Sequence, residues 1–204
     1  MIKVFIKKNI IKMFQILNNF NFFKTLIGLI NIAQFESFNV INFKDFKIKL
    51  INPNNINNWR IKTFKTKEPE TLDWIDSFHL NSCFWDIGAN IGMYSIYAAK
   101  KFKNLNVISF EPSVFNLEVL ARNIFINNLN NISIMSLPIF NKNENNTFSM
   151  SNTDWGGALS NFGANKNWEG KTMDTLFQYK TFSLNPETLI SFLNLTPPDY
   201  LKID

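Results

Sequence analysis

The chain runs Cys83-Phe84-Trp85-Asp86-Ile87-Gly88-Ala89-Asn90-Ile91-Gly92 near its middle, and this stretch decides the fold. It opens with a short apolar run, Cys83 to Ile87, which is typical of a strand buried on both faces. The segment from Met93 to Phe102 then has the length and content of a helix. Between the two, Gly88 lets the backbone approach a ligand, and Gly92 lets the helix pack closely on the strand. We therefore predict a buried strand, a ligand-binding glycine loop and a helix.

The same alternation continues toward the C-terminus. Further apolar runs lie at Val107 to Phe110, Ile132 to Met135 and Tyr200 to Asp204. Helical patterns lie at Val114 to Asn123 and at Leu184 to Asn194, and between the last strands there is a polar break at Asn141 to Asn146 and a glycine-bearing loop from Trp155 to Gly170. Buried strands separated by helices indicate an α/β fold with a doubly wound, mostly parallel sheet.

The N-terminal third is basic. Residues 1–67 contain twelve basic and two acidic residues, a net charge of +10, whereas residues 68–204 carry −5. Residues 2–20 are predicted to form an amphipathic helix with a basic face, which either packs on the domain or docks on an anionic membrane through residues 1–24. We predict a half-exposed strand over residues 43–51, a turn over 52–55 and a short helix from Pro69. We also predict that the chain divides into an N-terminal extension, residues 1–40, and a domain, residues 41–204.

Composition excludes several classes of protein. With 204 residues, of which 46% are hydrophobic, the chain suits one globular domain with a substantial core. The single cysteine, Cys83, excludes an internal disulfide framework, and with His79 it supplies too few soft ligands for a structural zinc site. No apolar run approaches the ~20 residues of a membrane span, and none is followed by the cleavage pattern of a secretory signal. The sequence therefore predicts a cytoplasmic protein without a metal.

Strand-end carboxylates frame the glycine loop. Glu111 ends the second apolar run, 19 residues after Gly92, where it can accept hydrogen bonds from ribose hydroxyls. The spacing G-x-x-x-G differs from the G-x-G-x-x-G of dinucleotide sites, which favours a cofactor without phosphates. Asp86, Gly88 and Glu111 together indicate a nucleoside cofactor; the simpler alternative is a carboxylate that caps a helix.

At these residues the chain resembles the class I S-adenosylmethionine-dependent methyltransferases, which have a Rossmann-like fold, and more narrowly the FkbM family. The resemblance covers about Glu68 to Asp204, and the segments that carry it are Phe84–Ser95, Phe110–Asn116, Leu120–Asn123 and Pro198–Asp204. It implies S-adenosyl-L-methionine as cofactor and methylation of a hydroxyl, in this family on sugars and secondary metabolites. A glycan or glycolipid at the inner membrane face would suit the basic N-terminal third. Because the family has further strands after this point, the resemblance also implies a truncated chain with an incomplete C-terminal half.

The resemblance implies roles for the residues around the cofactor. The methionine part would lie against the glycine loop, at Gly88, Ala89, Asn90 and Gly92. Glu111 would hold the ribose, Pro112 would turn the chain away from the sheet, and Asn116 would anchor the loop after the second strand.

Two further roles follow from the same resemblance, and a third follows from the predicted sheet and the chemistry of methyl transfer. Asp86 would order the glycine loop or reach the amino group of the cofactor through water, and Ser136-Leu137-Pro138 would form a wall for adenine. Asp204, at the tip of the strand beside the first, is a candidate general base or substrate anchor, because methyl transfer to a hydroxyl requires removal of its proton.

Other functions remain open on the residues alone. A nicotinamide-dependent oxidoreductase could use the same α/β order, although the third glycine is missing, and a truncated paralogue could bind the cofactor or a membrane without turnover. Nucleic acid is not an expected partner, because no Asn-Pro-Pro-aromatic or Asp-Pro-Pro-aromatic motif follows a cofactor strand and because Phe22, Phe23 and Phe35 are interpreted as core. Trp155-Gly156-Gly157 and Trp168 belong either to an acceptor lid or to a glycine turn with a packing tryptophan.

Overall fold

The structure is a computed structural model that describes residues 2–164 and 170–204, and of residues 2–4 only the backbone. The chain divides into two compact units, Met1–Phe38 and Asn39–Asp204.

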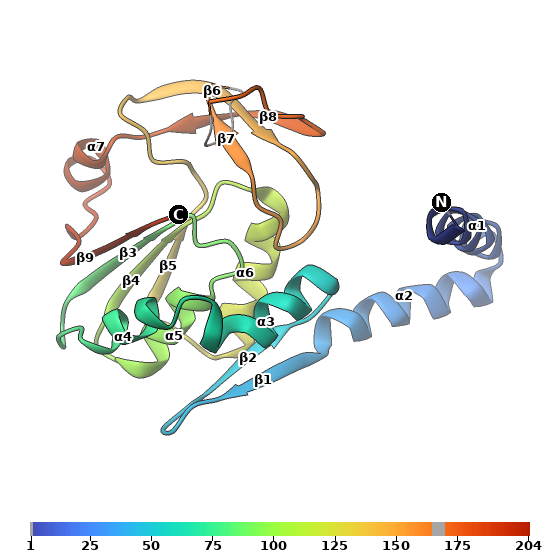
Figure 1. Ribbon diagram of the computed structural model, residues 1–204, viewed down its shortest axis with the longest axis horizontal. Helices are drawn as coiled ribbons and strands as arrows, with labels where there is room; N and C mark the ends of the chain where they lie inside the picture. Colours follow the sequence, from blue (N-terminus) through green and yellow to red (C-terminus); the bar gives the residue numbers. More distant parts are fainter. Residues whose placement is uncertain (1, 165–169) are drawn as a thin grey trace. The chain divides into compact units, whose positions relative to one another are not determined.

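The larger unit is built around a parallel sheet (Figure 1). Its strands are β3 (Cys83–Ile87), β4 (Asn106–Phe110), β5 (Ile132–Met135) and β9 (Tyr200–Ile203). They lie in the order β5-β4-β3-β9, and all neighbours are parallel. The chain proceeds from β3 to one side and later returns to the other side, so that β3 borders the topological switch point of a Rossmann-like sheet, where ligands bind. The predicted α/β fold with a doubly wound parallel sheet is confirmed.

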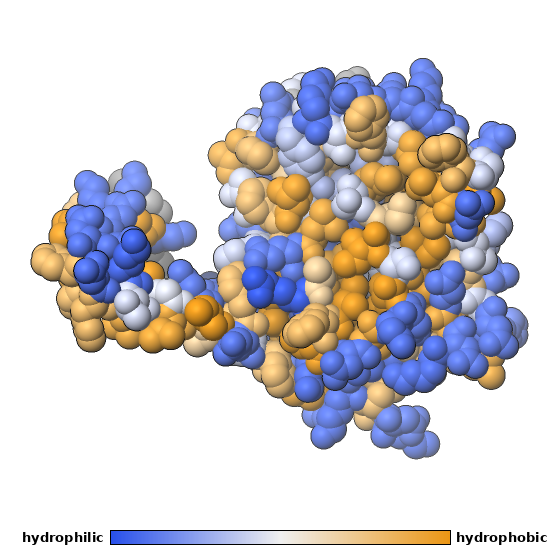
Figure 2. All heavy atoms as spheres, turned by 180° about the vertical axis from the view of Figure 1, so that it is seen from behind, coloured by the Kyte–Doolittle hydropathy of each residue, from blue (hydrophilic) through white to orange (hydrophobic). Residues whose placement is uncertain are grey.

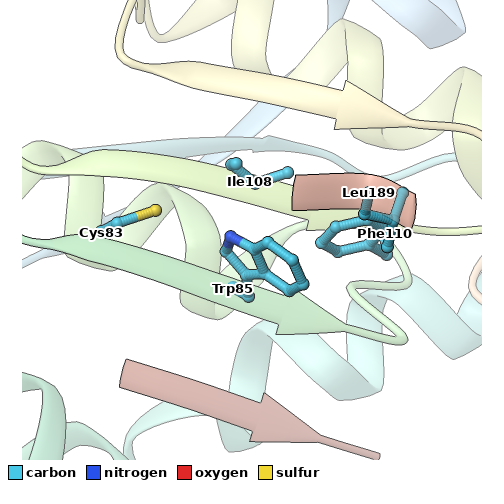
Figure 3. Packing of buried hydrophobic residues seen from close by; sticks show 5 residues of the cluster. All are labelled: Cys83, Trp85, Ile108, Phe110 and Leu189. Carbon is cyan, nitrogen blue, oxygen red and sulfur yellow. The ribbon is translucent and has the colours of Figure 1, made fainter. Parts of the chain in front are cut away.

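Helices cover both faces of the parallel sheet. On one face, α5 (Met93–Lys101) packs on β4 and β5, with α4 (Pro69–Asp76) beside it and Pro69 in its first turn as predicted. On the other face, Leu189 of α7 (Pro186–Ser191) belongs to a buried cluster with side chains of β3 and β4 (Figure 3). α7 is shorter than the predicted helix over 184–194, because Asn185 caps its first turn and Asn194 adopts a φ of +52°, which no helix continues.

A second, antiparallel sheet, which the sequence does not predict, lies beyond the carboxyl ends of the parallel strands (Figure 1). It contains β6 (Glu144–Met150), β7 (Ser160–Phe162) and β8 (Phe177–Ser183), in the order β7-β6-β8. The sequence indicates only a polar break there, because β6 begins with Glu and Asn residues, which are depleted in strands. Phe148, Met150 and Phe162 form a small buried core, so packing decides this sheet.

The segment before α4 also departs from the prediction. β1 (Phe38–Asn42) pairs with β2 (Lys47–Ile51), so residues 43–46 of the predicted strand form the connection between them. α3 (Asn55–Lys67) then begins inside the predicted turn, where the side chain of Asn54 accepts a hydrogen bond from the amide of Asn57. The Asn and Thr residues of α3 have modest helix propensity, and burial of Ile61 and Phe64 stabilises it.

The remaining helices are α6 (Val114–Ile126) in the larger unit and two helices in the smaller one. The smaller unit holds α1 (Ile2–Leu17) and α2 (Asn21–Glu36) in place of the single helix predicted over 2–20. Within the described residues no side chain of α2 is buried, so the interpretation of Phe22, Phe23 and Phe35 as core is wrong. Hydrophilic and apolar side chains both cover the surface of this unit (Figure 2). Of the helices in residues 2–164 and 170–204, none is both long enough and apolar enough for a bilayer span.

Candidate functional site

A cavity of about 680 Å³ opens at the carboxyl ends of the parallel strands. Most of its lining comes from the residues that end or directly follow β3, β4 and β5, from α3, and from the segment 157–162, which leads into and includes β7. Cavities of about 300–1,000 Å³ are typical of sites for small organic ligands. A smaller cavity between α3 and α5 shares Arg60, Lys67, Asn90 and Asp204 with it. The cavity therefore lies where the glycine loop predicts a ligand.

The glycine loop between β3 and α5 lies close to two other strands. The amides of Gly88 and Ala89 donate hydrogen bonds to the carbonyl of Phe110, at 2.9 and 3.0 Å. Gly88 has a φ of +79°, and a Cβ atom at this position would lie 3.2 Å from Cβ of Asp204. A side chain at position 88 would therefore be strained and would crowd the end of β9.

Gly92 has a different neighbour from the one predicted. A Cβ atom at this position would lie 2.3 Å from Cδ1 of Leu120 in α6, and the φ of Gly92 is +83°. Gly92 thus permits α5 to begin against α6, and its predicted contact with a strand is wrong. The spacing of the glycines contains no information about which later helix approaches them.

Glu111 lies at the end of β4 and lines the larger cavity. Its carboxylate accepts hydrogen bonds from the backbone amides of Asn90, at 2.7 Å, and Ser113, at 2.8 Å. The residue is 5% exposed, and burial raises the pKa of its carboxyl group to about 7, although these two hydrogen bonds lower it. A side-chain hydrogen bond from Asn116 lowers the pKa as well. Because a carboxylate has about four lone pairs in total, Glu111 can accept a further hydrogen bond from a ligand.

The backbone of Trp155-Gly156-Gly157 is held beside the cavity by side chains from several elements. The carbonyl of Trp155 accepts hydrogen bonds from Asn54 and Asn57, that of Gly156 from Arg60, and that of Gly157 from Asn90 and Asn116, at 2.8 to 3.1 Å. Three consecutive carbonyls are thus fixed, which favours a fixed turn over a lid. Trp168, the other residue considered for a lid, lies outside the described residues.

Asn116 has a wider role in this region than the predicted one. Its side-chain oxygen accepts a hydrogen bond from the amide of Gly156 at 2.9 Å, and its side-chain nitrogen donates to Gly157. The turn directly after β4 is held by the bond between Ser113 and Glu111. Asn116 therefore anchors the segment 155–157 in addition to the predicted loop, which it contacts through Glu111 and Ser113.

Asp86 lies behind the glycine loop. It is 1% exposed, and its Oδ2 accepts a hydrogen bond of 2.5 Å from the hydroxyl of Ser95, which in turn accepts one of 2.7 Å from Ser109. Burial raises the pKa of Asp86, and the charge of Lys202 lowers it. In the part of the chain that the structure describes, its Oδ1 has no hydrogen-bond partner. Asp86 therefore joins β3 to α5 and, through Ser95, to β4, and its predicted direct ordering of the glycine loop is not seen.

Asp204 lines both cavities at the end of β9. Its carboxylate forms an ion pair with Lys202, and the ammonium group of Lys202 lies 4.9 Å from the centre of the Tyr94 ring. The Tyr94 hydroxyl donates a hydrogen bond of 2.8 Å to Glu68. Burial and the Glu68 carboxylate raise the pKa of Tyr94, which keeps its phenol protonated. A carboxylate, an ammonium group and a phenol therefore gather at this edge of the site.

Two basic residues of α3, Arg60 and Lys67, also line both cavities, and the sequence does not predict them. Lys67 pairs with Glu68 at 2.7 Å, and Nε of Arg60 donates to the carbonyl of Gly156 at 2.9 Å. The excess of positive charge in residues 1–67 was a signal for them, but without the helix α3 nothing places that charge at the strand ends.

The predicted site residues fall into three groups. The larger cavity is lined by Gly88, Asn90, Glu111, Pro112 and Asn116, together with Leu137 and Pro138 of the expected adenine wall. Ala89 lines the smaller cavity, whereas Asp86 and Gly92 line neither. Within residues 2–164 and 170–204, His, Cys, Asp and Glu side chains form no group of three or more that could hold a metal ion.

Comparisons with known proteins give short matches. No family model matches the chain. The methyltransferase sdnD of Sordaria araneosa is 40% identical over 42 residues, which are 21% of this chain, and the match spans 16% of the length of that protein.

Two solved structures are similar over less than half of the chain. The precorrin-6y C5,15-methyltransferase of Geobacter metallireducens is 22% identical, with a TM-score of 0.32, over 33% of this chain and 36% of that one. TYW2 of M. jannaschii, in complex with AdoMet, is 22% identical, with a TM-score of 0.36, over 48% of this chain and 42% of that one.

Proposed function

We propose that this chain is an S-adenosylmethionine-dependent methyltransferase that methylates a sugar hydroxyl of a glycan or glycolipid. The observation that carries the proposal is the position of Glu111, whose carboxylate lines a cavity at the switch point of a parallel sheet and is bonded to the glycine loop at Asn90. The local similarity to a curated methyltransferase supports the same activity.

The residues present fit this cofactor. An open lone pair of Glu111 matches a ribose hydroxyl, and Leu137 and Pro138 offer apolar surface to a purine ring. Gly88 and Asn90 of the glycine loop line the larger cavity, where we propose that the methionine part lies, and the lack of a side chain at Gly88 lets Asp204 approach the loop. The other residues proposed to surround the cofactor are Ala89, Asn90, Pro112 and Asn116. Asp86 and Gly92 line neither cavity, and we propose that they act through α5, to which Asp86 is bonded by Ser95.

Methyl transfer would need little further chemistry from the chain. S-adenosylmethionine supplies an activated methyl group when it is bound. Asp204 lines both cavities, and we propose that its carboxylate accepts the proton of the acceptor hydroxyl or anchors the acceptor. The ion pair with Lys202 orients this carboxylate, and the cavity walls would hold the acceptor in line with the methyl group.

The proposal is tested by calorimetric titration of S-adenosylhomocysteine into the wild-type chain and into Glu111→Gln. A neutral amide loses the charge that strengthens the hydrogen bond to the ribose, so we expect the affinity to fall by at least about tenfold. The matched control is Glu118→Gln, because Glu118 is an exposed carboxylate of α6 that pairs with Arg122 outside the cavity. Equal affinities of the wild type and Glu111→Gln would contradict the proposed ribose site.

The alternatives have distinct outcomes in the same experiment. Binding of NAD⁺ in place of S-adenosylhomocysteine would favour the oxidoreductase. Binding of S-adenosylhomocysteine without transfer of a deuterated methyl group to any sugar acceptor, measured by mass spectrometry, would favour a non-catalytic paralogue.

A membrane contact is a second part of the proposal, which places a cytoplasmic protein at the inner membrane face through residues 1–24. This segment contains five lysines, and the first acidic residue of the chain is Glu36. Large apolar side chains of α1 are exposed, among them Phe5, Ile6 and Ile16. A helix with basic and apolar side chains suits the interface of an anionic bilayer.

A further inference from the structure

Arg60 lines both cavities and differs from the nearby lysines in having no carboxylate partner among the described residues. Lys67 pairs with Glu68 at 2.7 Å, and Lys202 pairs with Asp204. Arg60 has no ion pair in the described part of the chain, and the one hydrogen bond of its side chain there runs from Nε to the carbonyl of Gly156 at 2.9 Å. Its terminal nitrogens, Nη1 and Nη2, have no hydrogen-bond partner among these residues.

The guanidinium group is partly withdrawn from water. Burial lowers the pKa of Arg60, and the charges of Asp204, Glu111 and Glu68 raise it only in part. These carboxylates therefore compensate the positive charge incompletely. A partly desolvated charge is unfavourable unless an opposite charge and hydrogen bonds offset the loss of water. An anionic ligand in the cavity would supply both.

The bond to Gly156 also fixes the direction of the guanidinium plane. Asn54 and Asn57 hold the neighbouring carbonyl of Trp155, at 2.9 and 2.8 Å, so the backbone that receives Nε is itself anchored. A guanidinium group has five N–H donors, and with Nε engaged the four on Nη1 and Nη2 remain in a fork that matches two oxygens of a carboxylate or phosphate.

We propose that Arg60 is an anion-binding residue of this site, whose Nη atoms take a carboxylate or phosphate group of a bound ligand. The choice of the nucleosides used to test this role rests on the proposed function. Two ligands could supply the anion: the cofactor through the carboxylate of its methionine part, or an acceptor such as a sugar phosphate. Both use the same chemistry, and the experiment separates them.

The test uses Arg60→Gln, which removes the charge and keeps a donor on the side chain, and Lys62→Gln, which removes an exposed charge of α3 that lines neither cavity. S-adenosylhomocysteine is titrated into each protein, and so is 5′-methylthioadenosine, which lacks the amino acid part and its carboxylate. Inorganic phosphate is then titrated into each protein saturated with whichever of the two binds. Thermal unfolding checks that each variant is folded.

Two results support the proposal. If the cofactor supplies the anion, Arg60→Gln weakens S-adenosylhomocysteine at least tenfold and leaves 5′-methylthioadenosine unchanged. If the acceptor supplies it, both nucleosides bind as in the wild type, and phosphate binding weakens at least tenfold. Lys62→Gln is expected to match the wild type in every titration.

Two other results overturn it. Arg60→Gln could bind all three ligands as the wild type does, or it could weaken both nucleosides equally, which would mean that Arg60 acts only by holding the segment 155–157. A wild-type protein that binds neither nucleoside contradicts the proposed function instead. In that case, the phosphate titration of the unliganded wild type and Arg60→Gln tests whether Arg60 binds an anion, independently of the proposed function.

Discussion

Glu111 shows at the scale of one residue how the fold prepares a ligand site. Two backbone amides, of Asn90 and Ser113, hold its carboxylate, and yet burial raises its pKa to about 7. Near neutral pH the protonated and the charged form therefore coexist. A ligand that donates a hydrogen bond to this carboxylate would favour the charged form, so we expect ligand binding to lower the pKa of Glu111.

This pKa makes stability depend on pH. The carboxyl group of Glu111 holds a proton more tightly in the folded state than in the unfolded chain, where its pKa is 4.5. The resulting stabilisation is complete below about pH 4.5 and is lost as the pH rises through about 7. We expect the free energy of unfolding of the wild type, relative to Glu111→Gln, to fall by up to about 3 kcal/mol across that range.

Urea unfolding at a series of pH values measures this difference, and tryptophan fluorescence reports it because all five tryptophans lie in residues 39–204. Glu118→Gln serves as the control, and its free energy of unfolding should change with pH as that of the wild type does. A difference between wild type and Glu111→Gln that does not change with pH would show that the pKa of Glu111 is the same in the folded and the unfolded chain, and not raised by burial.

At the scale of elements, the glycine loop sets how closely α5 and α6 pack. Leu120 of α6 occupies the space beside Gly92 and is fully buried, and Asn123 of the same helix donates a hydrogen bond of 2.9 Å to the carbonyl of Ile91. The start of α5 is thus fitted against α6 through one residue without a side chain. This contact also holds the loop that lines the cavity.

Gly92→Ala should destabilise the larger unit. The φ of +83° is strained for alanine, and its Cβ atom would lie 2.3 Å from Leu120, which must move within a packed core. We expect a loss of about 2–4 kcal/mol in the free energy of unfolding from the two effects together. Urea unfolding followed by tryptophan fluorescence measures it.

Gly28→Ala in α2 is the matched control, because a Cβ atom there has open space around it and alanine favours a helix. It should leave the transition of the larger unit unchanged. A Gly92→Ala protein as stable as the wild type would mean that Leu120 can move away without loss of packing.

At the scale of the whole molecule, the net charge differs between the two ends of the chain. Residues 1–67 carry a net charge of +10 and the rest −5, and α1 exposes lysines and large apolar side chains. Because each lysine near an anionic surface contributes about 1 kcal/mol, replacing Lys7, Lys8 and Lys12 by Gln should weaken binding to phosphatidylglycerol vesicles on the order of 100-fold.

Co-sedimentation with vesicles measures this binding, with phosphatidylcholine vesicles as the neutral reference. The control replaces three exposed lysines of the larger unit, Lys62, Lys142 and Lys180, and should bind nearly as the wild type does. Equal loss in both triple variants would indicate attraction by total charge, and no binding of the wild type to either vesicle would contradict the membrane contact.

The sequence by itself determined the parallel sheet, the glycine loop and the position of Glu111 at a strand end. These features are local: a short apolar run indicates a buried strand, and the carboxyl ends of neighbouring parallel strands meet at one edge. Residues within one βαβ unit can therefore be placed from their spacing.

The tertiary structure alone decided which distant parts complete the site. The bond from Arg60 to Gly156 joins residues 96 positions apart, and the bonds of Asn116 to Gly156 and Gly157 cross from α6 to the segment before β7. α3 and β6 have weak local preferences and exist because Phe64 and Phe148 are buried. Periodicity reports which face of an element is buried and not what covers it, so these partners follow only from packing of the whole chain.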